Sequence, residues 1–545
     1  MRLHAPPWVS RGFAQLVLLL GSTACAADEP TVLLRGTVID SDTKAPLPCR
    51  ISIRGEDGTW HFPSAVGLDG SAVIYNKHSL SDAGIVEMHT TLSPHPFQVA
   101  LAPGRYTLMV ERGKEYHPWT RRVEIGREPV SMTIPLRRWC DMAALGWYSG
   151  ETHVHRALCE LPKLLLAEDL NVAFPLLDWV REAGVTPISR RARSQTDPGA
   201  APILVDETHW IYPRNTEYEI FTVDRKPHTL GAFFVLNHKT PLDLGAPPVR
   251  PIGERAHREG ALIELDKHNW PWSMALVPIL PVDLYELSNN HVWQTRFGIT
   301  EFGEAAAGYM NVERDSRGFT ERGWIDFGFQ NYYALLDCGF RLRPTAGTAS
   351  GVHPVPLGFG RVYVHLGPGS KLDGDEWIAG LDAGRSFVTT GPMLIASLNG
   401  QDPGSVPRGG PYRLRGSARA SVPLERIEVV VNGEVARSIT PANRRTDREA
   451  FESEFDESLE IDGTSWVAVR CFEARPDRRV RFAHTAPFHV EVAGKPLRPR
   501  KAEVDYLIAR VKQQIVRSAG ILSESALDEY RAALRAYERI AETAR

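Results

Sequence analysis

The sequence predicts an α/β central region between two β-sandwiches, followed by a helical tail. In residues 141–395, short apolar runs bounded by polar turns alternate with helical stretches, which is typical of buried strands in a parallel sheet or barrel. Residues 31–140 and 396–497 carry short strands separated by turn residues, a spacing that favours sandwiches. In residues 498–545, apolar side chains recur at helical spacing, so this segment is expected to be helical.

Residues 1–26 have the pattern of a secretory signal peptide. A basic start precedes the short apolar core Phe13–Leu20, and Ala24–Ala26 resembles a small-residue cleavage site. The segment therefore predicts a secreted or periplasmic protein, and a rival interpretation makes Cys25 a lipidated residue. Nothing later offers about 20 continuous apolar residues, so no transmembrane segment is expected.

The flanking segments carry their own local signals. Arg50–Arg54 alternates, with Ile51 and Ile53 on one face, and residues 31–140 resemble a carboxypeptidase-regulatory-like β-sandwich. We favour a structural spacer over a docking or carbohydrate-binding module. Asn432-Gly433 lies between two alternating runs and predicts a hairpin. A capping box at Ser525 is expected to open the last helix, which packs on the body or mediates self-association; the oligomeric state is left open.

Composition excludes several classes of protein. The chain has 63 basic and 66 acidic residues, so it offers no electrostatic argument for nucleic acid or a membrane surface. Cleavage after residue 26 leaves an odd, scattered set of cysteines, which is not a disulfide framework, although one or two bridges remain open. No Cys-x-x-Cys occurs, which excludes a zinc ribbon.

The most informative stretch is Gly150–Arg156, which follows an apolar strand-like lead-in. His153 and His155 stand at i and i+2, so on a strand they point to the same face. Two neutral imidazoles on one face can hold one divalent metal. Such a pair also occurs by chance on half-buried strands, so its spacing alone leaves metal binding and packing equally open.

Further polar residues stand at the ends of the expected central strands. Glu217 and Glu219 share one face of an extended segment, and His228 precedes an apolar strand. The stretch Glu264–His268 ends another strand, and His291 follows the strand-like run 284–287. Histidines and carboxylates at successive strand ends can converge on one ion that keeps an open position for water. Such an ion lowers the pKa of its water to about 7.

These stretches together resemble the PHP (polymerase and histidinol phosphatase) superfamily. Within it, the chain is similar to the carbaryl-hydrolase-like (CehA/McbA-type) secreted metallohydrolases. The resemblance implies a distorted (β/α)7 barrel over residues 141–395, with metal ions at its mouth. It is carried by the stretches 147–156, 167–173, 228–232, 287–291, 343–351, 360–364 and 384–392.

The resemblance also implies roles for individual residues. His153 and His155 match the first metal motif of the superfamily. Glu217 matches the bridging carboxylate, with Glu219 as its rival. His228 matches the histidine that opens the following strand.

The resemblance also implies two ligands later in the chain, and the sequence differs from the superfamily pattern at two places. His291 belongs to the implied metal site, and His268 is the weaker match because this branch favours Lys267 beside it. Trp179 stands where the superfamily usually has a histidine after an aspartate, and residues 348–350 replace its Asp-x-His. The missing ligands imply one or two divalent ions, with zinc favoured and manganese or iron as alternatives.

The leading hypothesis is a secreted metal-dependent hydrolase acting on an ester, carbamate, amide or phosphoester of a small-molecule or carbohydrate-like substrate. Asp178 or Glu219 is the candidate general base, and Arg156 or Lys267 would neutralise developing charge. One alternative is a non-catalytic carbohydrate- or protein-binding protein with a relic barrel. A narrower alternative is a phosphoesterase.

Several residues also have a structural interpretation. Arg156 could equally pair with a carboxylate. Trp270, Trp272 and Trp293 could line a pocket, but core packing is favoured because aromatic side chains usually carry core area. Surface or loop positions are expected for His209, His238, His257 and His353.

Overall fold

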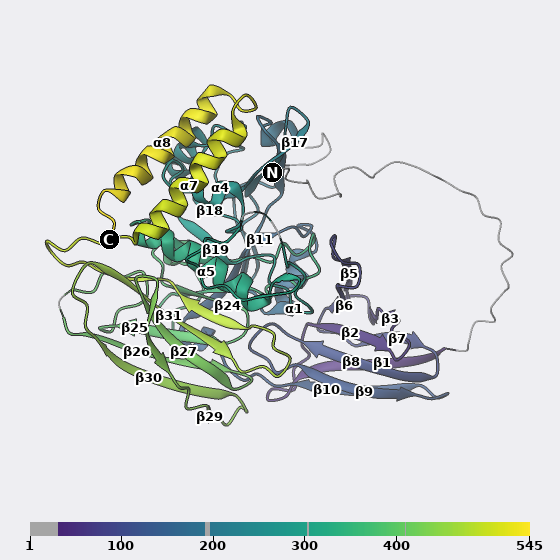
Figure 1. The fold of residues 1–545 in the computed structure, drawn as a ribbon. Coiled ribbons are helices and arrows are strands. Elements are labelled where there is room, and N and C mark those ends of the chain that lie inside the picture. The colour runs from purple at the N-terminus through teal and green to yellow at the C-terminus, as the bar shows by residue number, and fades with distance from the viewer. Residues whose placement is uncertain (1–30, 191–196, 302, 304, 409) are drawn as a thin grey trace.

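The computed structural model describes residues 31–190, 197–301, 303, 305–408 and 410–545 (Figure 1). The expected signal peptide and Cys25 lie outside the described residues. The fold is mixed α/β, with many strands and few helices. Within the described part of the chain, no helix combines the length and apolar character needed to cross a membrane. The five cysteines there are all free thiols.

Residues 32–136 form two facing sheets. Their strands are β1 (Val32–Asp40), β2 (Cys49–Gly55), β3 (Trp60–His61), β4 (Ser64–Ala65), β5 (Ala72–His78), β6 (Val86–Leu92), β7 (Phe97–Leu101), β8 (Gly104–Glu111), β9 (Trp119–Ile125) and β10 (Val130–Leu136). One sheet has the order β10-β1-β7-β4, and the other has the order β5-β6-β2-β8-β9 with β3 beside β2. Leu34 and Phe97 from the first sheet meet Ile51 and Leu108 from the second in one buried core.

The central region is built on two mixed sheets. Its strands are β11 (Trp147–Val154), β12 (Val172–Pro175), β13 (Asp178–Glu182), β14 (Ile203–Asp206), β15 (His209–Ile211), β16 (Thr216–Val223), β17 (Lys226–Leu236), β18 (Leu262–Leu265), β19 (Leu284–Ser288), β22 (Arg343–Ala346) and β23 (Arg361–His365), with a small ribbon of β20 (Arg314–Asp315) and β21 (Gly318–Phe319). One sheet contains the order β14-β15-β12-β11-β23, and the other has the order β13-β16-β17-β18-β19-β22.

The expected parallel sheet is wrong at β17, which runs antiparallel to both β16 and β18. The cause is a tight turn: Asp224 and Arg225 have φ of 49° and 61°, and Val223 pairs with Lys226 across them. Two consecutive left-handed residues make a hairpin turn, which joins neighbouring strands antiparallel. With this hairpin and few helices between strands, the distorted (β/α)7 barrel is not confirmed.

The end of β11 lies between the two central sheets. The backbone N–H of Ala349 donates to His153 O at 2.8 Å, and that of His155 donates to Ser350 O at 2.9 Å. On its other side, the N–H of Leu176 donates to the last carbonyl of β11 at 2.8 Å. Backbone hydrogen bonds on both sides therefore fix the His-x-His segment in place.

The helices lie outside the sheets. They are α1 (Leu161–Glu168), α2 (Pro187–Arg190), α3 (Arg250–Arg258), α4 (Pro271–Ala275), α5 (Glu321–Asp337), α6 (Gly374–Asp382), α7 (Lys501–Ser518) and α8 (Glu524–Ala541), with a short 3-10 turn at Ala143–Leu145. The tail helices α7 and α8, yellow in Figure 1, pack on α4, where Trp272 Nε1 donates to Tyr530 Oη at 2.7 Å. The expected cap at Ser525 is wrong, because Ser523 accepts from Ala526 N–H and the helix begins at Glu524.

The last β-rich segment continues a central sheet instead of starting a separate one. Its strands are β24 (Ser386–Thr389), β25 (Met393–Leu398), β26 (Tyr412–Ala420), β27 (Leu424–Val431), β28 (Glu434–Ile439), β29 (Arg444–Arg445), β30 (Phe451–Leu459), β31 (Ser465–Glu473), β32 (Phe482–Thr485) and β33 (Phe488–Val490). β24 pairs with both β23 and β32, so one sheet crosses the expected boundary at residue 395. A second sheet, β25-β26-β30-β29, packs on it. The hairpin expected at Asn432-Gly433 is confirmed.

Candidate metal centre

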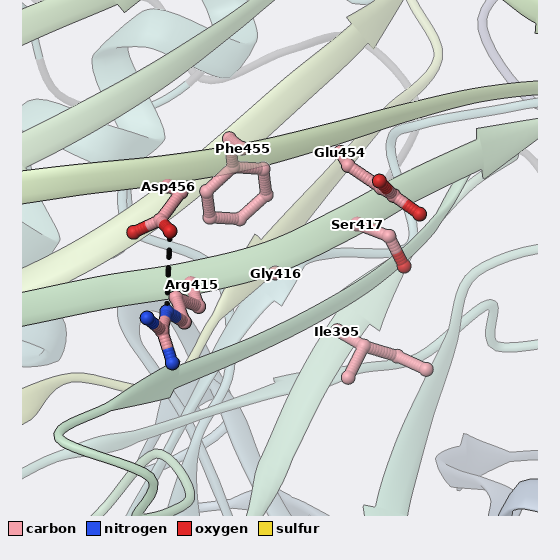
Figure 2. A pocket seen from close by; sticks show the side chains of 7 residues that line it. All are labelled: Ile395, Arg415, Gly416, Ser417, Glu454, Phe455 and Asp456. Carbon is pink, nitrogen blue, oxygen red and sulfur yellow. Dashed lines mark hydrogen bonds and ion pairs between the residues drawn. The ribbon is translucent and has the colours of Figure 1, made fainter.

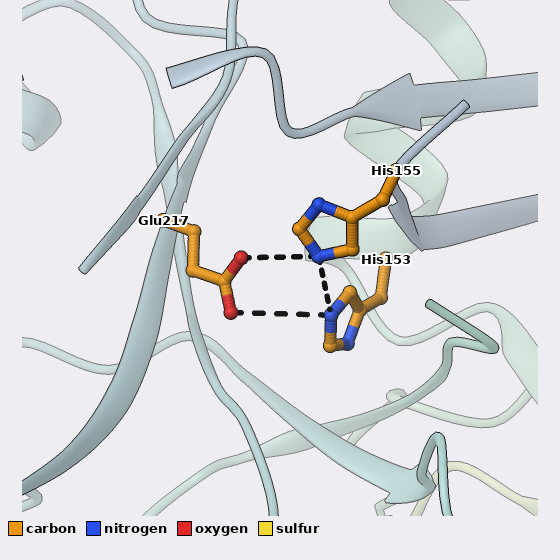
Figure 3. Close-up of side chains that lie close together, drawn as sticks. All are labelled: His153, His155 and Glu217. Atoms are coloured by element: carbon orange, nitrogen blue, oxygen red, sulfur yellow. Dashed lines mark hydrogen bonds and ion pairs between the residues drawn. The ribbon is translucent and has the colours of Figure 1, made fainter. Parts of the chain in front are cut away.

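Three side chains converge on one point: His153 at the end of β11, His155 just after it, and Glu217 on β16. Nε2 of His153 lies 3.2 Å from Nε2 of His155 and 4.0 Å from Oε1 of Glu217. Nε2 of His155 lies 3.1 Å from Oε2 of Glu217. Figure 3 shows the two rings and the carboxylate pointing toward one another. The structure thus brings together three of the residues that the sequence picked out.

Two further carboxylates meet His153 at the ends of neighbouring parallel strands. Leu265 of β18 pairs with Tyr285 of β19, so the next residues, Asp266 and Glu286, come side by side. Nδ1 of His153 lies 3.1 Å from Glu286 Oε1 and 3.8 Å from Asp266 Oδ1. Sequence reasoning marked both strand ends but missed these two side chains. The available signal was a carboxylate at the carboxyl end of each of two successive strands.

The segment after β22 approaches the same point closely. At Gly347, a Cβ atom would overlap both the Cβ of His153 and Oε1 of Glu286, so a glycine is required there. Thr348 turns away from His153 and donates through its backbone N–H, at 2.7 Å, and its hydroxyl to Glu151. Residues 348–350, which stand where the superfamily usually has Asp-x-His, therefore support β11 and supply no ligand.

Burial sets the protonation of the two imidazoles. His153 is 1% exposed, and burial lowers its pKa well below that of a free imidazole. Burial also lowers the pKa of His155 to about 4. Both rings are therefore neutral at pH 7, which is the state that binds metals.

The carboxyl groups respond to burial in the opposite direction. Burial raises the pKa of Glu217 and of Glu286 well above the ordinary value, and the charge of Asp266 adds to both shifts. Burial opposes ionisation of Asp266 as well, but the adjacent Lys267 ammonium holds its pKa below the ordinary value. A nearby positive charge favours the ionised form of a carboxyl group, so a bound cation would lower these raised pKa values and be held by the resulting carboxylates.

The His153–His155–Glu217 group fits one divalent ion. Zinc holds nitrogen and oxygen ligands at about 2.0–2.2 Å, so tetrahedral neighbours lie roughly 3.3–3.5 Å apart. Two of the observed separations, 3.1 and 3.2 Å, are close to that spacing, and the third, 4.0 Å, is wider. Oε2 of Glu217 is buried and makes no hydrogen bond. The carboxyl oxygen of Glu286 beside Nδ1 of His153 would fix that ring with Nε2 free for metal, as is usual for histidine ligands.

Lys267 and Glu219 lie beside this group. The Lys267 ammonium donates to Oδ2 of Asp266 and lies 3.6 Å from Oε1 of Glu219. The indole N–H of Trp179 donates to Oε2 of Glu219 at 3.2 Å. Burial raises the pKa of Glu219 to about 8. Both residues were sequence candidates, and both face the metal group.

His228 does not reach this group, which corrects its expected role as a ligand. Its Nε2 lies 3.2 Å from Oγ of Ser518 at the end of α7. The register of the β16–β17 hairpin explains the error. Phe234 of β17 stands opposite Glu217, and the residues around His228 lie near the turn.

Asp178 also lies away from the group. It pairs with Thr216 on β16, whereas its neighbour Trp179 pairs with Glu217. Because successive strand residues point to opposite faces, Trp179 takes the position facing the metal group. Its indole ring lies 4.9 Å from the ring of His155. The expected general-base role of Asp178 has no geometric support.

Arg156 pairs elsewhere. Its guanidinium lies 4.5 Å from the ring centre of Tyr75, on β5 of the N-terminal sandwich. Its Nε lies 3.1 Å from Oε2 of Glu160. These contacts match the structural interpretation of Arg156, a pairing with a carboxylate.

His268 and His291 are close neighbours of the centre but not members of its ligand groups. Nδ1 of His268 lies 3.1 Å from Nδ2 of Asn289, and its ring packs on Trp324 at 4.5 Å. The ring of His291 lies 5.8 Å from that of His353. His353 lies half-buried in the loop between β22 and β23, which fits the expected loop position, and burial lowers its pKa to about 3.

A separate hollow lies on the C-terminal sheet formed by β25, β26 and β30. Figure 2 shows its open wall, with an ion pair between Arg415 and Asp456. Its volume is about 460 Å³, and its lining contains no histidine or cysteine. It is lined by Ile395, Arg415, Gly416, Ser417, Glu454, Phe455 and Asp456.

Comparisons with known proteins add little to this geometry. No protein-family model matches the chain, and no curated protein matches it. Among solved structures, it is similar to a two-domain protein from Bacteroides vulgatus ATCC 8482 containing a predicted PHP-like metal-dependent phosphoesterase. The identity is 9% and the TM-score 0.31, over 65% of this chain and 98% of that chain. At that TM-score the likeness carries no argument about this protein.

Replacing Glu286 by glutamine tests the support given to His153. We expect zinc affinity to fall by about 10–100-fold, the usual effect of losing the carboxyl group behind a histidine ligand. Isothermal titration with zinc measures this, with the exposed Glu207→Gln as a matched control. Unchanged affinity in Glu286→Gln would show that Glu286 does not act on the centre.

Proposed function

We propose that this protein is a metal-dependent hydrolase holding its ion through His153, His155 and Glu217. One observation carries the proposal: two neutral imidazole nitrogens and a buried carboxylate converge at ligand spacing. Nitrogen and carboxylate donors in this ratio favour zinc, with manganese and iron as alternatives. The substrate bond would be an ester, carbamate, amide or phosphoester.

The bound ion would activate a water molecule and polarise the bond to be cleaved. A bound ion would lower the raised pKa of Glu219, so that its carboxylate, which the Trp179 indole orients through Oε2, could accept a proton. Lys267, whose ammonium lies 3.6 Å from Oε1 of Glu219, would stabilise negative charge that develops on the substrate. The ring centre of Trp270 lies 5.2 Å from this ammonium, and both side chains are buried.

We also infer that the central strands close a distorted seven-stranded barrel around the centre. β12 and β13 are separated by only two residues and act as one bent strand shared by the two sheets. At the other edge, a parallel bridge between Val154 and Ser350 links β11 to the segment after β22. The order would be β11, β12–β13, β16, β17, β18, β19 and β22.

The export pattern of residues 1–26 supports placing this hydrolase outside the cytoplasm. The motif around His153 and the later matched stretches support membership of the carbaryl-hydrolase-like branch of the PHP superfamily. A small-molecule or carbohydrate-like substrate is the matching proposal.

Glu219→Gln tests the proposed chemistry separately from metal binding. We expect kcat to fall by at least about 100-fold, the lower range for loss of a general base, while metal content stays unchanged. The assay is hydrolysis of p-nitrophenyl acetate, an aryl carbamate, an anilide and bis(p-nitrophenyl) phosphate by zinc-loaded protein. Glu207→Gln, on an exposed loop, serves as the control.

The outcomes separate the rival functions. Metal-dependent turnover of any of the four probes supports a hydrolase and identifies its bond class. If the protein binds metal but hydrolyses none of the four probes, and also gives a signal on a glycan array, the non-catalytic binding protein would be favoured. Unchanged turnover in Glu219→Gln would show that Glu219 is not the general base.

A further inference from the structure

A second cluster of potential ligands lies next to the proposed metal group. Oxygen atoms of Glu217, Glu219 and Asp266 lie within 4.8 Å of one another. All three side chains are buried, with exposed fractions of 1%, 7% and 0%. Three carboxylates at this spacing form a potential cation site, because hard divalent ions prefer oxygen ligands.

The register of three strands creates this cluster. Ala232 of β17 pairs with Glu219 on one side, and its neighbour Phe233 pairs with Leu265, just before Asp266, on the other. Ala232 is therefore the residue between Glu219 and Asp266. Its small side chain leaves room for the two carboxylates to approach each other across β17.

A cation of the chain itself already lies in the cluster. The Lys267 ammonium, on a side chain only 3% exposed, donates to Oδ2 of Asp266 and lies 3.6 Å from Oε1 of Glu219. Indole N–H groups take further acceptor positions: Trp270 donates to Oδ2 of Asp266 at 3.1 Å, and Trp179 donates to Oε2 of Glu219 at 3.2 Å. These contacts occupy Oδ2 of Asp266 and Oε2 of Glu219, two of the oxygens that a second metal ion would need, whereas Oδ1 of Asp266 and Oε2 of Glu217 make no hydrogen bond.

We propose that the Lys267 ammonium takes the place of a second metal ion, so that the centre holds a single divalent ion. This inference rests on the proposed function, because it assumes an ion at His153, His155 and Glu217. An ammonium and a divalent ion at the same carboxylates would repel each other. The positive charge beside the catalytic ion is therefore permanent and does not depend on a second metal.

Metal stoichiometry in Lys267 variants tests the inference. Lys267→Met removes the charge and keeps the length of the side chain, whereas Lys267→Arg keeps the charge. Each protein is saturated with zinc, passed through a desalting column and analysed by elemental mass spectrometry. We expect one equivalent per chain in the wild type and in Lys267→Arg, and two in Lys267→Met.

The results separate failure of this inference from failure of the proposed function. Two equivalents in the wild type, or one in a folded Lys267→Met, would overturn the inference and leave the hydrolase intact. If the wild type bound no zinc, both the inference and the proposed function would be contradicted. If Lys267→Met does not fold, electron paramagnetic resonance of the manganese-loaded wild type distinguishes one bound ion from two. A six-line spectrum of an isolated ion supports the inference, and exchange coupling between two ions overturns it.

Discussion

Replacing His153 and His155 together by alanine should abolish metal binding while leaving the fold intact. The double variant removes two of three ligands, so its zinc affinity should fall well beyond the roughly 10–100-fold loss typical of supporting residues. The measurement is zinc per chain by elemental mass spectrometry after desalting. Hydrolase activity should disappear with the metal.

A matched control uses the histidine that the sequence wrongly marked as a ligand. His228→Ala should keep full metal content, because its Nε2 contacts Ser518 and not the centre. Circular dichroism establishes that both proteins are folded. Equal zinc content in the double variant and in His228→Ala would contradict the assigned ligand set.

Replacing Arg50 by alanine should destabilise the protein by about 3–5 kcal/mol, the range for breaking a buried ion pair by removing one partner. Arg50 lies on β2, and its guanidinium donates to Glu168 of α1 at 2.6 Å and to Glu111 at 2.8 Å. The Arg50 and Glu168 side chains are only 5% and 4% exposed. Without the guanidinium, two carboxylates at the contact between the N-terminal sandwich and α1 would lose their counter-charge.

Urea denaturation followed by tryptophan fluorescence measures this effect. Arg413→Ala is the control, because it breaks an ion pair with Asp456 whose side chains are 52% and 43% exposed. Such an exposed pair contributes at most about 1 kcal/mol. A loss in Arg50→Ala no larger than in the control would mean that the sandwich is not anchored through Arg50.

The part of the centre that could be predicted from sequence is the part set by single strands. Glu217 and Glu219 share a face of β16 because of the two-residue period of a strand, and the same period, continued one residue past the end of β11, brings His153 and His155 together. Asp266 and Glu286 were missed because their meeting depends on the pairing of β18 with β19. Local sequence does not specify which strands become neighbours.

The errors have the same origin. The chemistry of Asp178 makes it one of two candidate bases, but strand alternation turns its neighbour Trp179 toward His155 instead. His228 was placed by motif, but the tight turn at Asp224-Arg225 shifts it away from Glu217.

In the fold too, features set by local sequence were predictable and features set by long-range strand pairing were not. Asn432-Gly433 predicted a hairpin correctly because turn residues act locally. The helical spacing in the tail likewise predicted α8, although its cap differs by two residues. The sheet that joins the central region to the C-terminal strands was not predictable, since β23, β24 and β32 pair across long stretches of sequence.

An anomalous difference map from a crystal grown with zinc tests the central claim most directly. The account predicts one strong peak between Nε2 of His153, Nε2 of His155 and the carboxylate of Glu217, and no peak beside Lys267. Zinc bound elsewhere with no peak among these three residues would contradict the proposed metal centre.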